Sequence, residues 1–138
     1  MLVRAYLVLL VMAVLMSAAH GAELEHCPVT ENGQAVELAI EKAASCEKAM
    51  ETFRACAYAA SGDVQLGAAV IRRCEADFVN KLSRRQKRTY HQELKRCWLK
   101  YGRQPGTIYR SLEAMCAAGV AQAYSRTFQK AGGRKKIR

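Results

Sequence analysis

The chain has 138 residues, and 22 Lys and Arg against 12 Asp and Glu give it a formal net charge of +10. This length suits one domain, and the excess of basic residues favours an anionic partner. The sequence holds no P-loop, HExxH motif or serine nucleophile elbow. We therefore expect a protein that is not an enzyme, with no catalytic residue, no metal and no cofactor.

The first residues have the order of a secretory signal peptide over 1–19. A short start with Arg4 precedes the apolar stretch 5–16, and Ser17-Ala18-Ala19 supplies the small residues that signal peptidase requires. We expect cleavage after residue 19 or 21. An uncleaved anchor is less favoured, because the stretch is shorter than the roughly 20 residues of a spanning helix. The mature chain is expected to be secreted or periplasmic, with no membrane span and a net charge of +9, since only Arg4 is lost.

Apolar residues recur at steps of three and four along most of the remaining chain, which predicts helices rather than strands. We expect an irregular entry over 20–34, a helical domain over 35–129 and a flexible basic tail over 130–138. The helices of the domain are predicted over 35–60, 64–82, 83–101 and 107–129.

Turn and capping residues set these boundaries. Ser61-Gly62-Asp63 ends the first helix, and Asp63 is predicted to cap the second. Ser83-Arg84-Arg85-Gln86 has the form of a capping box. No glycine or proline separates 64–82 from 83–101, so one long bent helix is an open alternative. The stretch 102–106, with two glycines and a proline, breaks the chain before the last helix.

Six cysteines lie after the signal, and an even number in a small exported chain predicts disulfides. Free thiols or a metal site are less favoured, because no pair has the CxxC spacing. Taken as neighbours in the sequence, the cysteines enclose similar loops of 18, 17 and 18 residues. The last two pairs lie on either side of a predicted turn, where antiparallel helices bring them level, and the first would tie the irregular entry to the first helix. We therefore predict an all-α fold, a small bundle of antiparallel helical hairpins stapled by three disulfides: Cys27–Cys46, Cys56–Cys74 and Cys97–Cys116.

Short motifs between Asp63 and Phe128 follow the pattern of a known family. They are the Asp-x-x-Leu opening 63–66, the leucine, glutamine and aromatic run 82–90, Cys97, the turn 106–107, and Cys116 followed by 123–126. In these features the chain resembles the LprI-type lysozyme-inhibitor family, whose members are exported, helical and cysteine-containing. The resemblance implies an exported helical protein that binds another protein. It assigns no inhibitory residues.

Positive charge is concentrated on the third predicted helix. Between Lys81 and Arg103 nine residues are basic and only Glu93 is acidic. Clustered like charges repel each other and invite an anionic partner. A solvated face that aids solubility is the alternative reading. The candidate partner-binding residues are Arg84, Arg85, Lys87, Arg88, Lys95 and Arg96.

Aromatic residues share this helix, and their spacing with Leu94 fits core packing better than stacking on bases. These residues are Tyr90, Trp98 and Tyr101. Export also argues against a nucleic-acid partner. The sequence thus predicts an exported, non-enzymatic binding protein that acts on another protein in the periplasm or outside the cell. A cationic envelope-associated protein that binds anionic polymers or lipid head groups is the alternative, and the oligomeric state stays open.

Overall fold

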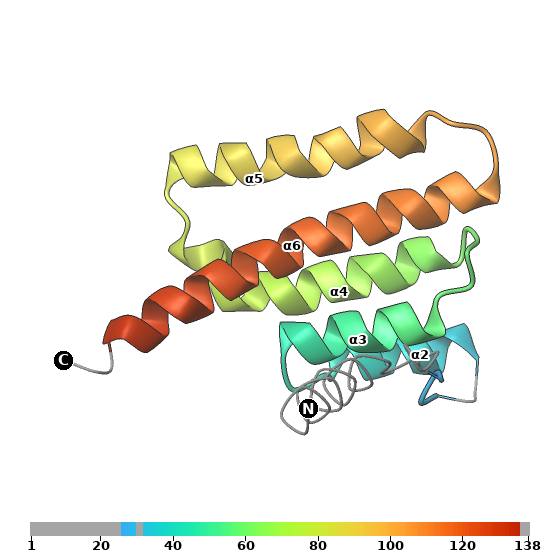
Figure 1. Ribbon diagram of the computed structural model, residues 1–138, viewed down its shortest axis with the longest axis horizontal. Coiled ribbons are helices and arrows are strands. Elements are labelled where there is room, and N and C mark those ends of the chain that lie inside the picture. The colour runs from blue at the N-terminus through green and yellow to red at the C-terminus, as the bar shows by residue number, and fades with distance from the viewer. Residues whose placement is uncertain (1–25, 30–31, 136–138) are drawn as a thin grey trace, which may run out of the picture.

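The computed structural model describes residues 26–29 and 32–135. The expected signal peptide, its cleavage site and residues 136–138 lie outside the described residues. Within them the chain is all-α, as predicted, and its helices pack together with no strand among them (Figure 1). None of the described helices is both long enough and apolar enough to cross a bilayer.

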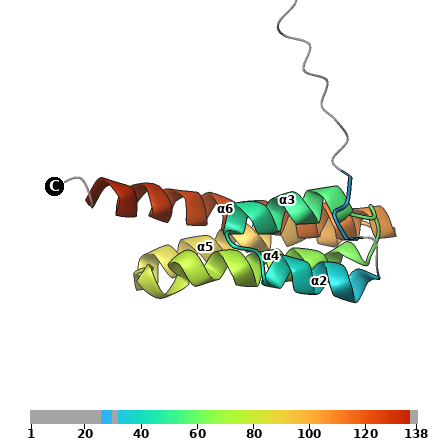
Figure 2. The same cartoon turned by 90° about the horizontal axis from the view of Figure 1, so that it is seen from below.

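Five α-helices build the described part of the chain. They are α2 (Gly33–Glu41), α3 (Cys46–Cys56), α4 (Asp63–Phe78), α5 (Arg84–Cys97) and α6 (Thr107–Lys135). A 3₁₀ turn, Val79–Lys81, follows α4, and a π-helical turn, Trp98–Gly102, extends α5. Figure 1 shows α5 at one edge of the bundle and α2 and α3 at the opposite edge. Seen from below in Figure 2, α3 and α6 lie in one layer and α2 and α4 in the other.

The helix predicted over 35–60 is wrong, because the chain turns at 42–45 and forms α2 and α3 instead. Ser45 caps α3, where its side chain accepts a hydrogen bond from a backbone N–H of the first turn. Arg73 of α4 donates to the carbonyl oxygens of Ala43 and Ala44 at 2.8 and 2.9 Å. This contact from a distant helix satisfies the carbonyls that the break leaves unpaired. The apolar period continues through the break, so the period alone does not reveal it.

Two other helix ends differ from the prediction, and one start is confirmed. Helix α2 begins at Gly33 rather than at residue 35, because Asn32 caps it. Helix α6 continues to Lys135, six residues beyond its expected end at Gln129. Ser83 and Gln86 form the predicted capping box, with both reciprocal hydrogen bonds present. This box separates α4 from α5, which settles the open alternative of one bent helix.

Asp63 is fully buried and does not cap α4 as predicted. It is the first residue of that helix, and its carboxylate accepts hydrogen bonds from the backbone N–H groups of Tyr58 at 2.8 Å and Ala60 at 3.4 Å. The Ser111 hydroxyl donates to the same carboxylate at 2.6 Å. The carboxylate thus satisfies donors of the preceding loop rather than of the helix. Asp63 thereby joins the 57–62 loop, α4 and α6.

Three disulfides join Cys27 to Cys56, Cys46 to Cys74 and Cys97 to Cys116. The predicted Cys97–Cys116 pair is confirmed, and the other two predicted pairs are wrong. Cys46 and Cys74 each lie 14 residues from Ala60, in the loop between α3 and α4, so these antiparallel helices bring them level. Cys56 ends α3 and bonds instead to Cys27 in the entry segment. The disulfides indicate an oxidising, extracytoplasmic compartment.

Helices α4 and α6 approach each other closely where two small residues, Gly67 and Ala114, meet. A Cβ on Gly67 would lie 2.9 Å from the Ala114 Cβ and 3.1 Å from the Ala114 carbonyl oxygen. Only glycine fits at such a distance without moving the backbones apart. Around this contact the core is apolar and fully buried, and its largest members are Tyr90, Phe53, Phe78, Ile40, Met50 and Leu66.

Candidate partner-binding surface

Helix α5 is held at the edge of the bundle by Tyr90, which is fully buried. Its ring centroid lies 5.2 Å from that of Phe78 on α4 and 4.9 Å from that of Tyr124 on α6. The Tyr90 hydroxyl donates to the Glu75 carboxylate at 2.9 Å. Burial, and then this hydrogen bond, raise the pKa of Tyr90 far above its ordinary value. The phenol therefore stays neutral and acts as a fixed anchor for the inner face of α5.

The outer face of α5 carries the predicted binding residues, and all six of them are exposed. Arg84, Arg88 and Lys95 are spaced by four and seven residues, which puts them on one side of the helix. Arg85 and Arg96 lie next to this row, while Lys87 lies on its flank. We call the surface formed by these six residues the basic face. It points away from the bundle, because Tyr90 occupies the opposite side of α5.

No side chain of the basic face forms an ion pair or hydrogen bond with another described residue. Glu93, the only acid of α5, is half-buried and accepts a hydrogen bond from the Tyr124 hydroxyl at 3.3 Å. Glu75 is engaged by Tyr90 in the same way. These two carboxylates thus turn inward, and the positive charge of the face reaches solvent without a neutralising partner.

Two large apolar side chains adjoin the C-terminal end of the basic face. Trp98 and Leu99 are 41% and 43% exposed. The predicted core packing of Trp98 is therefore wrong. The Cys97 side chain points into the bundle, where it forms its disulfide. Successive residues of a helix are rotated by about 100°, so the Trp98 side chain next to it points away from the bundle. The Arg103 guanidinium instead lies 4.9 Å from the Trp98 ring.

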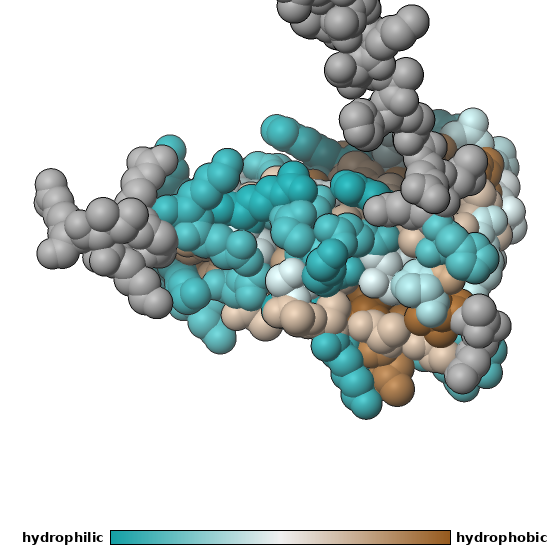
Figure 3. Space-filling model, turned by 60° about the horizontal axis from the view of Figure 1, so that its bottom comes forward, coloured by the Kyte–Doolittle hydropathy of each residue, from teal (hydrophilic) through white to brown (hydrophobic). Residues whose placement is uncertain are grey.

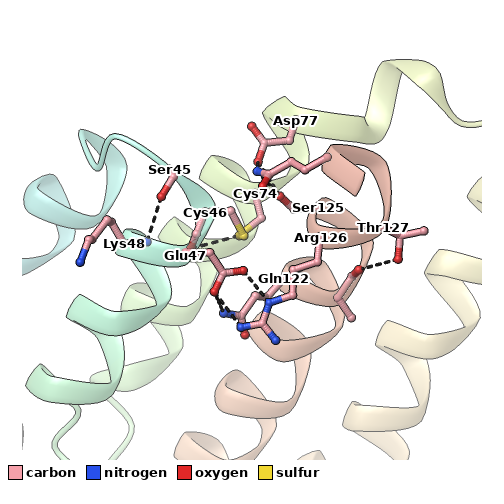
Figure 4. A network of polar contacts seen from close by, with 12 residues as sticks. Ser45, Cys46, Glu47, Lys48, Cys74, Asp77, Gln122, Ser125, Arg126 and Thr127 are labelled. Carbon is pink, nitrogen blue, oxygen red and sulfur yellow. Dashed lines mark hydrogen bonds and ion pairs between the residues drawn. A yellow bond between two sulfur atoms is a disulfide. The ribbon is translucent and has the colours of Figure 1, made fainter. Parts of the chain in front are cut away.

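Carboxylates elsewhere in the bundle are committed to structural contacts. Glu47 of α3 accepts hydrogen bonds from Arg126 Nε at 2.6 Å and Nη2 at 2.7 Å, and from Gln122 Nε2 at 2.7 Å (Figure 4). The Arg126 hydrogen bond is the main reason that the pKa of Glu47 lies below its ordinary value, although burial opposes it. This network fastens α3 to α6.

Asp77 makes the matching link from α4 to α6. The Ser125 hydroxyl donates to it at 2.5 Å and Arg73 donates at 3.2 Å. Burial alone would raise the pKa of Asp77, but these hydrogen bonds outweigh it and lower the pKa. Asp77 is therefore ionised at neutral pH, and its carboxylate is occupied by donors of the protein itself.

Hollows in the described surface lie away from the basic face, as two of them show. One, of about 320 Å³, lies between the entry segment and α3 and includes His26, Lys48 and Glu51 in its lining. Another, of about 170 Å³, is lined by apolar residues of α4 and α6 and by Glu113. In the described chain, no three His, Cys, Asp or Glu side chains are grouped to hold a metal ion.

Comparison with known proteins finds no relative: no protein-family model, no curated protein and no solved structure matches this chain. The similarity to the LprI-type family therefore stays a prediction from short motifs. What the structure adds is the placement of the basic face, on one rigidly anchored helix with an exposed tryptophan at its end.

Proposed function

We propose that this chain is an exported, non-enzymatic binding protein that docks an acidic protein surface on the basic face of α5. The proposal places it in the periplasm or outside the cell. The observation that carries it is the exposed charge of Arg84, Arg88 and Lys95, none of which is paired with an acid in the described chain. An anionic partner that approaches this face gains attraction without first breaking ion pairs.

A protein partner is favoured over a polymer by what surrounds the charge. Arginine and tryptophan are enriched at the energetic centres of protein interfaces. Here Trp98 is 41% exposed and stacks with Arg103 beside the basic face. A phosphate-rich polymer would use the charges and leave the tryptophan without a role. An anionic lipid surface would use both, because indole side chains favour the head-group region. These anionic envelope components are the second candidate.

Lysozyme inhibition is not part of the proposal, although the motifs resemble an inhibitor family. Lysozymes of the common type are basic, and the mature chain carries +9. Two basic surfaces repel each other, so a direct inhibitor should present acidic groups. The proposed partner is instead an acidic protein.

Capture from envelope extract by the mature, oxidised chain tests the proposal. We compare the wild type with R84E/R88E and with the matched control K42E/K130E, which makes the same charge change on exposed lysines outside α5. We expect an acidic protein on the wild type and the control, and its loss from R84E/R88E. Equal capture by all three would refute the proposal.

W98A separates the two candidate partner classes. Removing the indole should weaken capture of a protein partner, because a large apolar contact is lost. The same substitution should leave binding to polyphosphate nearly unchanged, because a phosphate chain offers no apolar contact to the indole. If W98A and wild type bind the captured protein equally, and polyphosphate competes it away, the polymer reading replaces ours.

A further inference from the structure

A small apolar cleft lies between α4 and α6. Its volume is about 170 Å³, and its lining includes two alanines, Ala68 and Ala117. Val64 also lines the cleft and is 45% exposed, so solvent reaches it. An engineered apolar cavity of about 150 Å³ holds one benzene molecule. The cleft therefore has the size for a single branched or aromatic side chain.

The cleft arises from the way in which α4 packs against α6. Gly67 and Ala114 line it and bring the two helices into close contact. Ala68 and Ala117 lie beside this contact and are half-buried. Neither of these short side chains fills the space next to the contact. Apolar surface of both helices is thus left uncovered there.

Trp98 connects this cleft with α5. A Cβ placed on Gly102 would lie 2.5 Å from Cδ1 of Trp98 and 2.8 Å from Oε2 of Glu113, so the indole and the carboxylate are close neighbours. Glu113 also lines the cleft. Ile71 lines it one turn before Glu75, the carboxylate that is hydrogen-bonded to α5. The cleft therefore lies on the side of α4 that faces α5, next to the exposed tryptophan.

The charge around Trp98 and the cleft is mainly positive. Arg103 lies over the Trp98 ring, and Lys95 precedes Trp98 by one turn of α5. Arg110 lies 3.7 Å from the carboxylate of Glu113. These three basic side chains are exposed and outnumber the one carboxylate. An apolar side chain that enters the cleft is therefore favoured when acidic residues flank it.

We propose that the acidic partner of α5 inserts one large apolar side chain, such as leucine, into the cleft between α4 and α6, against Trp98. Acidic residues next to this anchor then lie against Lys95, Arg103 and Arg110. The inference rests on the proposed function and adds the motif that the partner carries, an apolar anchor within an acidic segment. The anchor supplies selectivity, because burial of a leucine side chain stabilises a complex more than an exposed ion pair does.

Two short glutamate peptides test the anchor, one with a central leucine and one with serine in its place. Anisotropy of the labelled peptides measures their affinity for the mature, oxidised wild type. The leucine peptide should bind at least about tenfold more tightly than the serine peptide. Trp98 is the sole tryptophan of the chain, so its fluorescence reports on the cleft. The leucine peptide should shift this emission to shorter wavelength, and the serine peptide should not.

A117L fills the cleft with a side chain of the protein itself. It should remove the advantage of the leucine peptide and leave the affinity of the serine peptide unchanged. A123L is the matched control, because Ala123 is exposed on α6 and does not line the cleft. The advantage should persist in this control. A68L provides a second filled cleft should A117L fold poorly.

L38S is the control for unspecific apolar attraction. Leu38 on α2 is 48% exposed. Figure 3 shows hydrophobic side chains gathered over the α2 end of the molecule, which makes this control necessary. The advantage of the leucine peptide should be the same in L38S and in the wild type.

An advantage that A117L removes and that A123L and L38S retain supports the proposal. Equal binding of the two peptides overturns the anchor, while the proposed function stands if R84E/R88E weakens both. An advantage that persists in A117L, or that L38S removes, overturns the anchor as well. If neither peptide binds, the anchor and the proposed function fail together.

Two other occupants of the cleft would give different results. A wild-type dimer that A117L dissociates in sedimentation equilibrium would assign the cleft to a second copy of the chain. Binding to anionic phospholipid vesicles that A117L abolishes, without an advantage of the leucine peptide, would assign it to a lipid chain. Either result would overturn the proposal.

Discussion

Cys46 at the start of α3 is bonded to Cys74 in the middle of α4, and both side chains are fully buried. The bond fixes how the α3–α4 hairpin closes, since it joins positions equally far from the loop. It also packs inside the core beneath α6. The disulfide therefore has two roles: it restricts the conformations of the unfolded chain, and it is part of the packed core of the folded protein.

Replacing this pair in C46S/C74S should destabilise the protein by about 3.5 kcal/mol, the chain-entropy value for a loop of this length. The separation of the two cysteines is 28 residues. Urea unfolding of the oxidised proteins measures the difference. Peptide mapping without reduction is the control, and a Cys27–Cys46 or Cys56–Cys74 peptide would contradict the structure.

Two glycines, Gly67 and Gly119, should respond in opposite ways to alanine. G67A pushes a Cβ against the Ala114 backbone and should cost about 1–3 kcal/mol, because α4 and α6 must separate. G119A meets open space and should gain up to about 1 kcal/mol from helix propensity. Urea unfolding at low protein concentration checks both. Equal effects of the two substitutions would contradict the packing described for α4 and α6.

The Tyr90 hydroxyl should contribute measurably to the docking of α5. Y90F leaves the ring cluster in place but deprives Glu75 of its hydrogen bond, which should cost about 1–2 kcal/mol. Y58F is the matched control, since Tyr58 is 53% exposed. A Y90F protein as stable as Y58F would show that the hydrogen bond is not formed in solution.

Acid should weaken the contact between Glu47 and Arg126. The pKa of Glu47 is lower in the folded protein than its ordinary 4.5, so the unfolded chain binds more protons there as the pH falls. The stabilisation is complete above pH 4.5 and is lost as the pH drops through the lowered value.

E47Q removes this titration. Near neutrality E47Q should therefore be less stable than the wild type, and its stability should fall less steeply below pH 4.5, so that the two proteins converge in acid. Urea unfolding at a series of pH values measures the slopes. If the free energy of unfolding fell with the same slope below pH 4.5 in E47Q and in the wild type, Glu47 and Arg126 would not be paired in solution.

Local signals in the sequence predicted much of the fold. The capping box at Ser83 and Gln86 is such a signal, because both hydrogen bonds run within one turn. The apolar steps likewise predicted helical structure throughout. The break at 42–45 was not predictable in this way. It is held by Arg73, which lies about 30 residues further along the chain, and Ser45 was the one local hint of a helix start.

The disulfide pairs were harder to predict, because they join residues that are far apart in the sequence. With 35–60 taken as one helix, Cys46 fell in mid-helix and Cys74 was paired with Cys56. When the loop between α3 and α4 is centred near Ala60, Cys46 and Cys74 are equally far from it. Antiparallel packing of the two helices then predicts the Cys46–Cys74 pair. The basic face was visible in the sequence because its charges are contiguous. The exposure of Trp98 was not, since its apolar character matches the core.

The most direct test of the account is the salt dependence of binding to poly-L-glutamate, a stand-in for an acidic protein surface. Affinity of the mature, oxidised wild type should fall steeply as sodium chloride rises. At low salt R84E/R88E should bind at least about tenfold more weakly, a loss of about 1.4 kcal/mol, while K42E/K130E keeps most of its affinity. Equal losses in the two variants would show that net charge, and not the outer side of α5, attracts the ligand.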